Sequence, residues 1–244
     1  MQYIIIKKKL NFNDPNGLKT SNSLTKKGEN MNVLIVYAHP EPRSLNGNLK
    51  TLAMETLKKE GHQVKISDLY AMKFKATLDE EDFSNRSNPE FFNPILEQVN
   101  AVATDTLPSD IKEEVDKLRW ADFVLLQFPI WWSSVPAILK GWFDRVFLPG
   151  VAHNIAEGKI YDTGLLKGKK AMLSYTTGAT NDLYSAQGPH GDIDEILKYI
   201  TYNILTAAGM EVLPSSGIFG ASTMEKEEVQ TELDKFKDLL KGIN

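Results

Sequence analysis

The fold is decided by a short apolar segment, Val33-Leu34-Ile35-Val36-Tyr37-Ala38. Six apolar residues in a row, without the alternation of a half-buried strand, are typical of a strand covered on both faces. Two similar runs follow, Phe123 to Phe128 and Ala171 to Tyr175. A weaker strand is marked at 64–66, and another begins at 211–213. The chain is therefore expected to contain five strands.

Helical segments separate these strands. Apolar spacing predicts helices over 48–59, 111–118, 136–147, 193–208 and 225–240, with Gly61 and Gly209 following two of them. Strands that alternate with helices indicate an α/β fold, a doubly wound parallel sheet with helices on both faces. The connection over 71–108 has weak periodicity, and a connection of this length is uncommon unless it is functional or a docking surface.

Composition excludes several classes of protein. The 244 residues, 42% hydrophobic and 25% charged, suit one sizeable domain, and a net charge of −4 argues against nucleic acid as a partner. The chain has no cysteine, which excludes disulfides, thiolate nucleophiles and iron–sulfur clusters. Its four histidines include no i, i+4 pair, so we expect no metal site. No apolar run has the roughly 18 residues of a membrane span, and a cytoplasmic protein is expected.

Residues 1–30 differ from the rest in being rich in Asn, Ser, Thr and Lys. Met31 resembles a natural start, because the first strand follows at once. We therefore predict an N-terminal extension over 1–30 that need not be ordered, and one domain over 31–244. A docking arm is the alternative for the extension.

In a doubly wound sheet, ligands bind beyond the carboxyl ends of the strands. The first loop at this edge runs from His39 to Asn48 and contains Ser44 and Asn46. Small polar side chains and free N–H groups at a helix start suit a phosphate, although Ser and Asn are also ordinary helix caps. Neither a G-x-G-x-x-G after the first strand nor a G-x-x-x-x-G-K-[ST] is present, which favours a flavin over a dinucleotide or P-loop site.

The loops after the two other buried strands are also unusual. Trp131 and Trp132 are adjacent at a strand end and suit stacking on a flat ring, the alternative being a core or interface cluster. The segment 176–178 is Thr-Thr-Gly, which supplies backbone donors. The same connection carries the phenol of Tyr184 and the imidazole of His190, which could instead cap the helix beside Asp192.

With these loops in view, the sequence resembles the NAD(P)H:quinone oxidoreductases of the DT-diaphorase type, a branch of the flavodoxin-like superfamily. The likeness covers about residues 31–220, and its most specific stretch is 127–147, Gln-Phe-Pro-Ile-Trp-Trp through Gly-Trp-Phe-Asp-Arg-Val-Phe. Separate matches lie at 67–72, 176–178 and 187–192. The flavodoxin-like fold has the strand order 2-1-3-4-5.

The resemblance implies an enzyme that binds FAD non-covalently, with FMN as the alternative. It would pass hydride from NAD(P)H to a quinone-like acceptor by a ping-pong mechanism, as a homodimer with the active site at the subunit interface. Carried over by position, Tyr184 and His190 match the catalytic pair. The cofactor-binding positions are His39, Ser44, Leu45 and Asn46 for the pyrophosphate and ribityl region, Pro129, Ile130, Trp131 and Trp132 for the ring wall, and Thr176, Thr177 and Gly178 for its polar edge.

Some positions depart from the family pattern. His153 and Ile155 stand where the family has two acceptor-pocket tyrosines, and Ala207 stands where it has an aromatic that comes from the partner subunit. Phe92 replaces a glutamine and Val229 a late arginine that contact the cofactor. These changes leave the acceptor and the choice between FAD and FMN open.

Two other functions compete with this enzyme. Some relatives are ancillary subunits of potassium-efflux transporters, and the same flavin loops would be present there. A Ser–His hydrolase is remote, because the chain has no G-x-S-x-G elbow.

Overall fold

The computed structural model describes residues 30–243, so the extension predicted over 1–30 lies outside the described residues except for Asn30. Parallel strands form one sheet in the order β2-β1-β3-β4-β5, with β6 also beside β4. The predicted fold class is thus confirmed. The strands are β1 (Asn32–Tyr37), β2 (Gln63–Asp68), β3 (Phe123–Pro129), β4 (Lys170–Thr176), β5 (Glu211–Val212) and β6 (Ser216–Ile218).

The predicted fifth strand is divided into two short pieces. Glu211 of β5 pairs with Lys170 at the start of β4, and Ser216 of β6 pairs with Ser174 nearer its end. Pro214 lies between the pieces and has no N–H to donate to β4. The strand therefore breaks there while keeping its place in the sheet.

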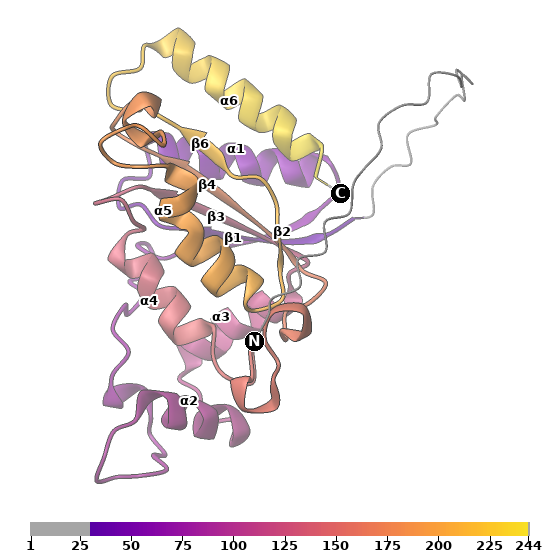
Figure 1. Cartoon of the computed structure of the whole chain (residues 1–244). Helices are drawn as coiled ribbons and strands as arrows, with labels where there is room; N and C mark the ends of the chain where they lie inside the picture. The colour runs from indigo at the N-terminus through magenta and orange to yellow at the C-terminus, as the bar shows by residue number, and fades with distance from the viewer. Residues whose placement is uncertain (1–29, 244) are drawn as a thin grey trace, which may run out of the picture.

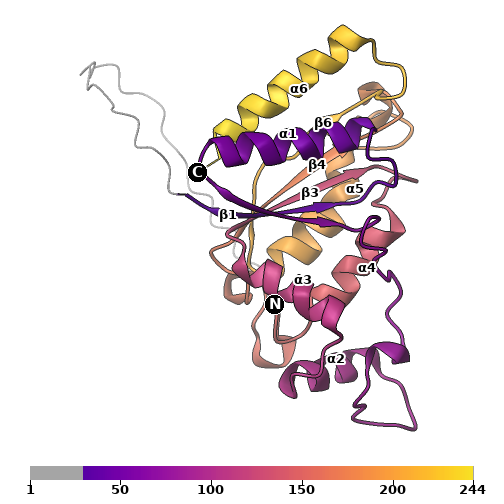
Figure 2. The ribbon, with the colours of Figure 1, turned by 180° about the vertical axis from the view of Figure 1, so that it is seen from behind.

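Helices cover both faces of the sheet, as Figures 1 and 2 show from opposite sides: α1 and α6 lie on one face, and α3, α4 and α5 on the other. The α-helices are α1 (Leu45–Lys59), α2 (Pro94–Ala103), α3 (Ser109–Trp120), α4 (Ala137–Val146), α5 (Ile193–Ile200) and α6 (Lys226–Lys241). Short 3₁₀ turns are η1 (Glu80–Asp82), η2 (Ile155–Glu157), η3 (Tyr161–Thr163) and η4 (Asn181–Tyr184). A π-helix, η5 (Thr201–Thr206), continues α5.

The alternation of side chains along β1 explains its unbroken apolar run. Val33 and Ile35 belong to the core under α1 and α6, whereas Leu34 and Val36 belong to the core under α3, α4 and α5. All four side chains are fully buried. A strand in the middle of such a sheet has no solvent face, and from Val33 to Tyr37 its sequence is therefore apolar.

At two of the helices, the difference from the prediction involves local hydrogen bonds. Helix α1 begins three residues early, at Leu45, since the Ser44 Oγ accepts the Gly47 N–H at 3.2 Å. The helix predicted over 193–208 changes from α to π at Thr201, and the Thr206 hydroxyl donates to the Thr201 carbonyl at 2.8 Å. Turns of π-helix are rare in proteins, and those that occur are frequently found at functional sites.

Helix α2 was not predicted, and it lies apart from the sheet at one end of the molecule (Figure 1). Its side chains Ile95, Leu96 and Val99 are exposed, so it lacks the regular buried stripe of a helix packed on the sheet. Asn93 caps its first turn by accepting the Leu96 N–H at 3.1 Å, and Pro94 follows. This Asn-Pro start was the local signal in the sequence.

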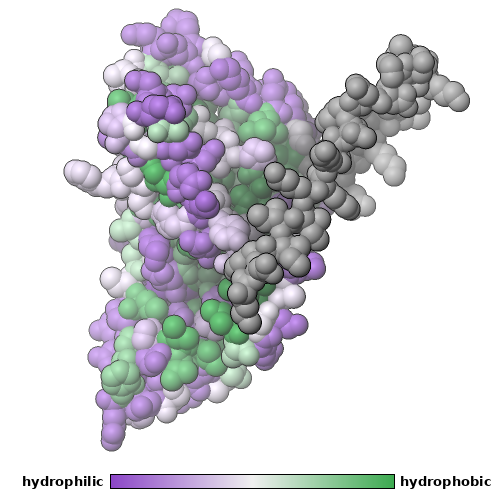
Figure 3. Space-filling view, in the orientation of Figure 1, coloured by the Kyte–Doolittle hydropathy of each residue, from purple (hydrophilic) through white to green (hydrophobic). Residues whose placement is uncertain are grey.

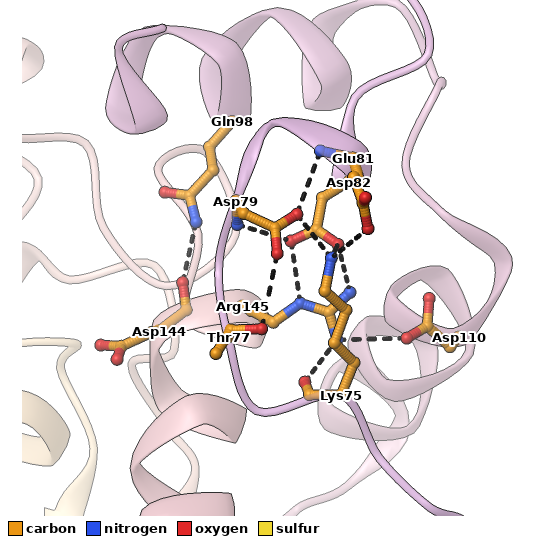
Figure 4. A network of polar contacts seen from close by, with 9 residues as sticks. All are labelled: Lys75, Thr77, Asp79, Glu81, Asp82, Gln98, Asp110, Asp144 and Arg145. Atoms are coloured by element: carbon orange, nitrogen blue, oxygen red, sulfur yellow. Dashed lines mark hydrogen bonds and ion pairs between the residues drawn. The ribbon is translucent and has the colours of Figure 1, made fainter.

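A buried ion-pair network joins the long crossover to α4 (Figure 4). The Arg145 guanidinium donates to both carboxylate oxygens of Asp82, at 2.7 and 3.1 Å, and to the Lys75 carbonyl at 2.8 Å. Arg145 also reaches Asp110 at 3.2 Å, while the Lys75 ammonium lies 3.1 Å from Asp82. The segment that follows β2 is thereby held against α4.

Replacing Arg145 should destabilise the protein, because a buried carboxylate then loses its main ion pair. Arg145→Met leaves the Asp82 carboxylate, which is almost fully buried, with Lys75 as its remaining cation, and should lower the free energy of unfolding by about 3 kcal/mol. The control is Lys140→Met on the same helix, whose pair with Asp144 is exposed and should contribute less than about 0.5 kcal/mol. Urea unfolding measures both, and equal losses would contradict the role assigned to Arg145.

Candidate functional site

An open groove of about 430 Å³ lies where β1, β3 and β4 end. It brings together ten of the eleven residues that the sequence analysis assigned to cofactor binding, leaving out Trp132. They are His39, Ser44, Leu45, Asn46, Pro129, Ile130, Trp131, Thr176, Thr177 and Gly178. Three loops that are far apart in the sequence therefore meet at one place.

The loop before α1 presents backbone donors to this groove. Ser44 satisfies the N–H of Gly47, while Leu45 and Asn46 begin the helix, where N–H groups have no partner within the helix. Gly47 is required here because a Cβ at this position would lie 1.9 Å from the Pro42 carbonyl oxygen. The tight loop and the positive end of a 15-residue helix suit an anion.

His39 and Arg43 are the two basic residues of this loop, and the structure separates them. Arg43 lies outside the groove and pairs with Glu41 at 2.9 Å, which lowers the pKa of the Glu41 carboxyl to about 2. His39 lines the groove and accepts the Glu41 N–H on Nδ1 at 3.0 Å. The same Nδ1 also lies 3.2 Å from the Glu41 carbonyl oxygen, so Glu41 occupies this ring nitrogen in either tautomer and Nε2 is the one left for a ligand.

The Asn46 side chain is not free for a ligand. Its amide donates to the Thr176 hydroxyl and accepts from Gln127, both at 2.8 Å, and the residue is almost fully buried. What Asn46 offers the groove is its backbone.

The tryptophans sit on a strained turn. Trp131 and Ser134 exchange backbone hydrogen bonds of 2.9 and 3.1 Å, and between them Trp132 and Ser133 have φ values of 51° and 56°. Residues other than glycine rarely adopt this left-handed conformation, which costs roughly 1 kcal/mol or more for each. The turn is fastened from outside, since the Ser134 hydroxyl lies 2.6 Å from the Tyr199 hydroxyl.

This turn gives the two indoles different surroundings. Trp131 lines the groove, is 40% exposed and has its ring 6.0 Å from that of His39. Trp132 is fully exposed and does not line the groove. One indole is thus a wall of the groove and the other projects from the surface.

Tyr184 and His190 lie together beside the groove. Their ring centroids are 5.0 Å apart, with Tyr184 buried and His190 exposed. The backbone N–H of His190 donates to the Leu183 carbonyl. Neither residue lines the groove, but the Tyr184 ring also contacts Phe219 at 6.1 Å. Phe219 lies two residues before Ala221, and Ala221 does line the groove.

Ala221 and Ser222 complete the groove and were missed by the sequence analysis. They follow β6, and the rule that ligands bind beyond the carboxyl ends of strands applies to that loop as well. The broken edge strand hid this signal, because Pro214 interrupts the apolar run.

A second cavity of about 280 Å³ lies between the last turn of α4, the loop after it and the π-helix. Its lining includes His153, Ile155 and Ala207, three of the positions at which the sequence departs from the family pattern. The Nδ1 of His153 is buried without a hydrogen-bond partner, and burial lowers the pKa of this imidazole. The neutral ring is therefore favoured in a mostly apolar cavity.

Within residues 30–243, no three acidic or histidine side chains are grouped so that they could hold a metal ion. In the same range, no helix is long and apolar enough to cross a membrane.

The chain belongs to the flavodoxin-like fold family, which it matches over residues 31–240. It is similar to the ribosyldihydronicotinamide dehydrogenase [quinone] of Mus musculus, with 44% identity over 212 residues that cover 86% of this chain and 91% of the relative. Its identity to NAD(P)H dehydrogenase [quinone] 1 of Rattus norvegicus is also 44%, over 86% of this chain and 76% of that one.

Among solved structures, a candidate quinone reductase from Klebsiella pneumoniae superposes with a TM-score of 0.82 at 42% identity, covering 86% of this chain and 83% of that one. Within the flavodoxin-like proteins, the chain is therefore a member of the NAD(P)H dehydrogenase (quinone) family and an oxidoreductase.

Relieving the strain of the tryptophan turn should stabilise the protein. Ser133→Gly places at φ 56° the one residue without a steric penalty there, and should raise the free energy of unfolding by about 1 kcal/mol over Ser133→Ala. Thermal unfolding of the two variants measures the difference. A glycine variant no more stable than the alanine variant would show that the turn stores no strain at Ser133.

Proposed function

We propose that this oxidoreductase binds FAD in the groove and uses NAD(P)H to reduce a quinone-like acceptor by a ping-pong mechanism. The observation that carries the proposal is the convergence of a phosphate-type helix start, an indole wall and the Thr176–Gly178 loop in one groove. The relatives named above support the donor and acceptor classes. When bound, a flavin accepts hydride from the nicotinamide and passes two electrons on.

The groove residues fit such a group. The phosphates would be held by the N–H groups of Leu45 and Asn46, by Ser44 and by the Nε2 of His39. The indole of Trp131 and the chain at Pro129 and Ile130 would flank the ring, with Thr176, Thr177 and Gly178 at its polar edge. The open space beside Gly178, where a Cβ would meet only Ser222 at 3.7 Å, leaves room for a close approach.

Trp132 has a different role in this proposal. Because its side chain is fully exposed and outside the groove, it would cover the ring only after a rotamer change or from a second copy of the chain.

The NAD(P)H donor and the quinone-like acceptor would use the same space beside the ring in turn, which is the basis of the ping-pong scheme.

Tyr184 and His190 would assist the transfer of protons and charge. A phenol beside an imidazole can donate a hydrogen bond to an atom on which negative charge develops, and the imidazole can give or take the proton. The exposed His190 can exchange that proton with solvent, while the buried Tyr184 is held against Phe219.

FAD is favoured over FMN by the long crossover between β2 and β3, which resembles the FAD-binding branch. The crossover is an ordered element, because α2 and the Arg145 network fix it to the body of the domain. Phe92 and Val229, in place of a glutamine and an arginine, are the positions that favour FMN.

A homodimer with the active site at its interface is the other part of the proposal. Apolar side chains gather on the lower part of the face in Figure 3, where α2 and the segment after α4 lie. Phe91 and Ile95 beside and on α2 are more than half exposed, as is Ile155 at the rim of the second cavity. A second copy would cover these side chains.

The direct test is to purify the protein and identify its flavin. We expect a yellow protein that releases FAD on heating and oxidises NAD(P)H when a quinone is present. The released flavin is identified by chromatography. A colourless preparation that stays inactive after FAD and FMN are added would end the proposal.

The catalytic pair is tested separately from binding. His190→Gln should slow flavin reduction by NAD(P)H about 100-fold at neutral pH while the flavin content is unchanged, because a general acid–base group is lost. Stopped-flow absorbance measures the rate. The control is His62→Gln, the same change at a histidine that accepts the Met31 N–H away from the groove. Equal rates in the wild type and His190→Gln would remove His190 from the mechanism.

A further inference from the structure

Beneath the groove, three side chains from distant parts of the sequence form one buried chain of hydrogen bonds. The Gln127 Nε2 on β3 donates to the Asn46 Oδ1 at 2.8 Å, and the Asn46 Nδ2 donates to the Thr176 Oγ1 at the end of β4, also at 2.8 Å. We call Gln127, Asn46 and Thr176 the amide relay. All three are at least 95% buried.

The direction of the relay follows from its one unsatisfied atom. The Gln127 Oε1 is buried without a partner. Turning both amides around would leave the Gln127 NH₂ without an acceptor instead, and a buried N–H without a partner is rarer than a buried C=O. Gln127 is therefore the donor at the start of the relay, and Thr176 is the acceptor at its end.

The relay ties the loop before α1 to the two strands beside it. Asn46 is the second residue of α1, one position before Gly47, whose backbone packs against Pro42. A shift of this loop relative to β3 and β4 would break two buried hydrogen bonds and leave polar atoms unpaired, which is costly inside a protein. The backbone N–H groups that line the groove are thus held in place before any ligand arrives.

Gln127 itself has no access to the groove. Its side chain is fully buried and is absent from the groove lining, whereas Asn46 and Thr176 belong to it. The polar contact of the Gln127 side chain towards the groove is the one that its Nε2 makes with Asn46. We propose that Gln127 is a positioning residue, which sets the phosphate-binding geometry of residues 44–47 through the amide relay. This inference rests on the proposed function in taking a phosphate-bearing flavin as the ligand.

The test compares flavins with and without phosphate. Gln127→Met keeps the volume of the side chain but removes the donor to Asn46. In flavin-free protein, we expect its dissociation constant for FAD to rise about tenfold, as the loss of an ordered hydrogen-bonded arrangement implies. The constant for riboflavin, which has no phosphate, should change less than about twofold. Fluorescence titration measures both.

Ser174→Ala is the matched control. Ser174 is a buried polar residue on β4, directly opposite Gln127 in the β3–β4 register, and it is outside the relay. It should leave both dissociation constants unchanged. An equal loss of FAD and riboflavin in Gln127→Met would indicate a general structural defect and overturn the proposal, as would unchanged FAD binding.

A measurement without any ligand keeps the two proposals distinguishable. In flavin-free protein, Gln127→Met should speed hydrogen exchange at the N–H groups of Gly47 and Asn48 about tenfold or more over Ser174→Ala, because these groups bond to Ser44 within the released loop. Equal exchange in the two variants would overturn the relay. A wild-type protein that binds neither flavin would defeat the proposed function, and the exchange result would still decide the positioning role.

Discussion

Covering both faces of one parallel sheet is the constraint on which the rest of this structure depends. Because β1, β3 and β4 are buried above and below, polar groups for chemistry are concentrated at the strand ends. The chain leaves β1 towards α1 on one face and leaves β3 towards α4 on the other. The two connections diverge, and the groove lies at this divergence.

The groove combines rigid and strained parts. Its floor is held by buried hydrogen bonds between Asn46, Gln127 and Thr176, and its far wall by a turn with two left-handed residues. The strain at Trp132 and Ser133 persists because the backbone bonds of Trp131 and the contact of Ser134 with Tyr199 over-determine the turn. Strain of this kind is typical of sites where the orientation of a side chain matters more than stability.

The sequence predicted the parts of the fold that obey simple periodicity. The buried runs were found because a strand with no solvent face is mostly apolar, and the strand-end rule brought the three loops to one groove. Helix α2 was missed because it does not pack on the sheet, and the π-helix because apolar spacing cannot separate it from an α-helix.

Side-chain orientation at the site was beyond the sequence for a different reason. Whether Arg43 turns to the groove or to Glu41, and whether Asn46 faces a ligand or Gln127, depends on partners far away in the chain or on competition between neighbours. Trp131 and Trp132 were treated as one wall, yet Trp132 lies in the turn of the backbone, and its indole projects outwards. Such choices are made by tertiary geometry and not by residue type.

The divided edge of the sheet has a consequence for aggregation. An outer strand offers a row of unsatisfied backbone groups onto which a foreign strand can add, and that addition is the first step towards fibres. Here the border consists of two short pieces, two and three residues long, separated by a proline. The sheet is thereby a poor template for growth at this side, and copies of the chain that meet there gain little by adhering.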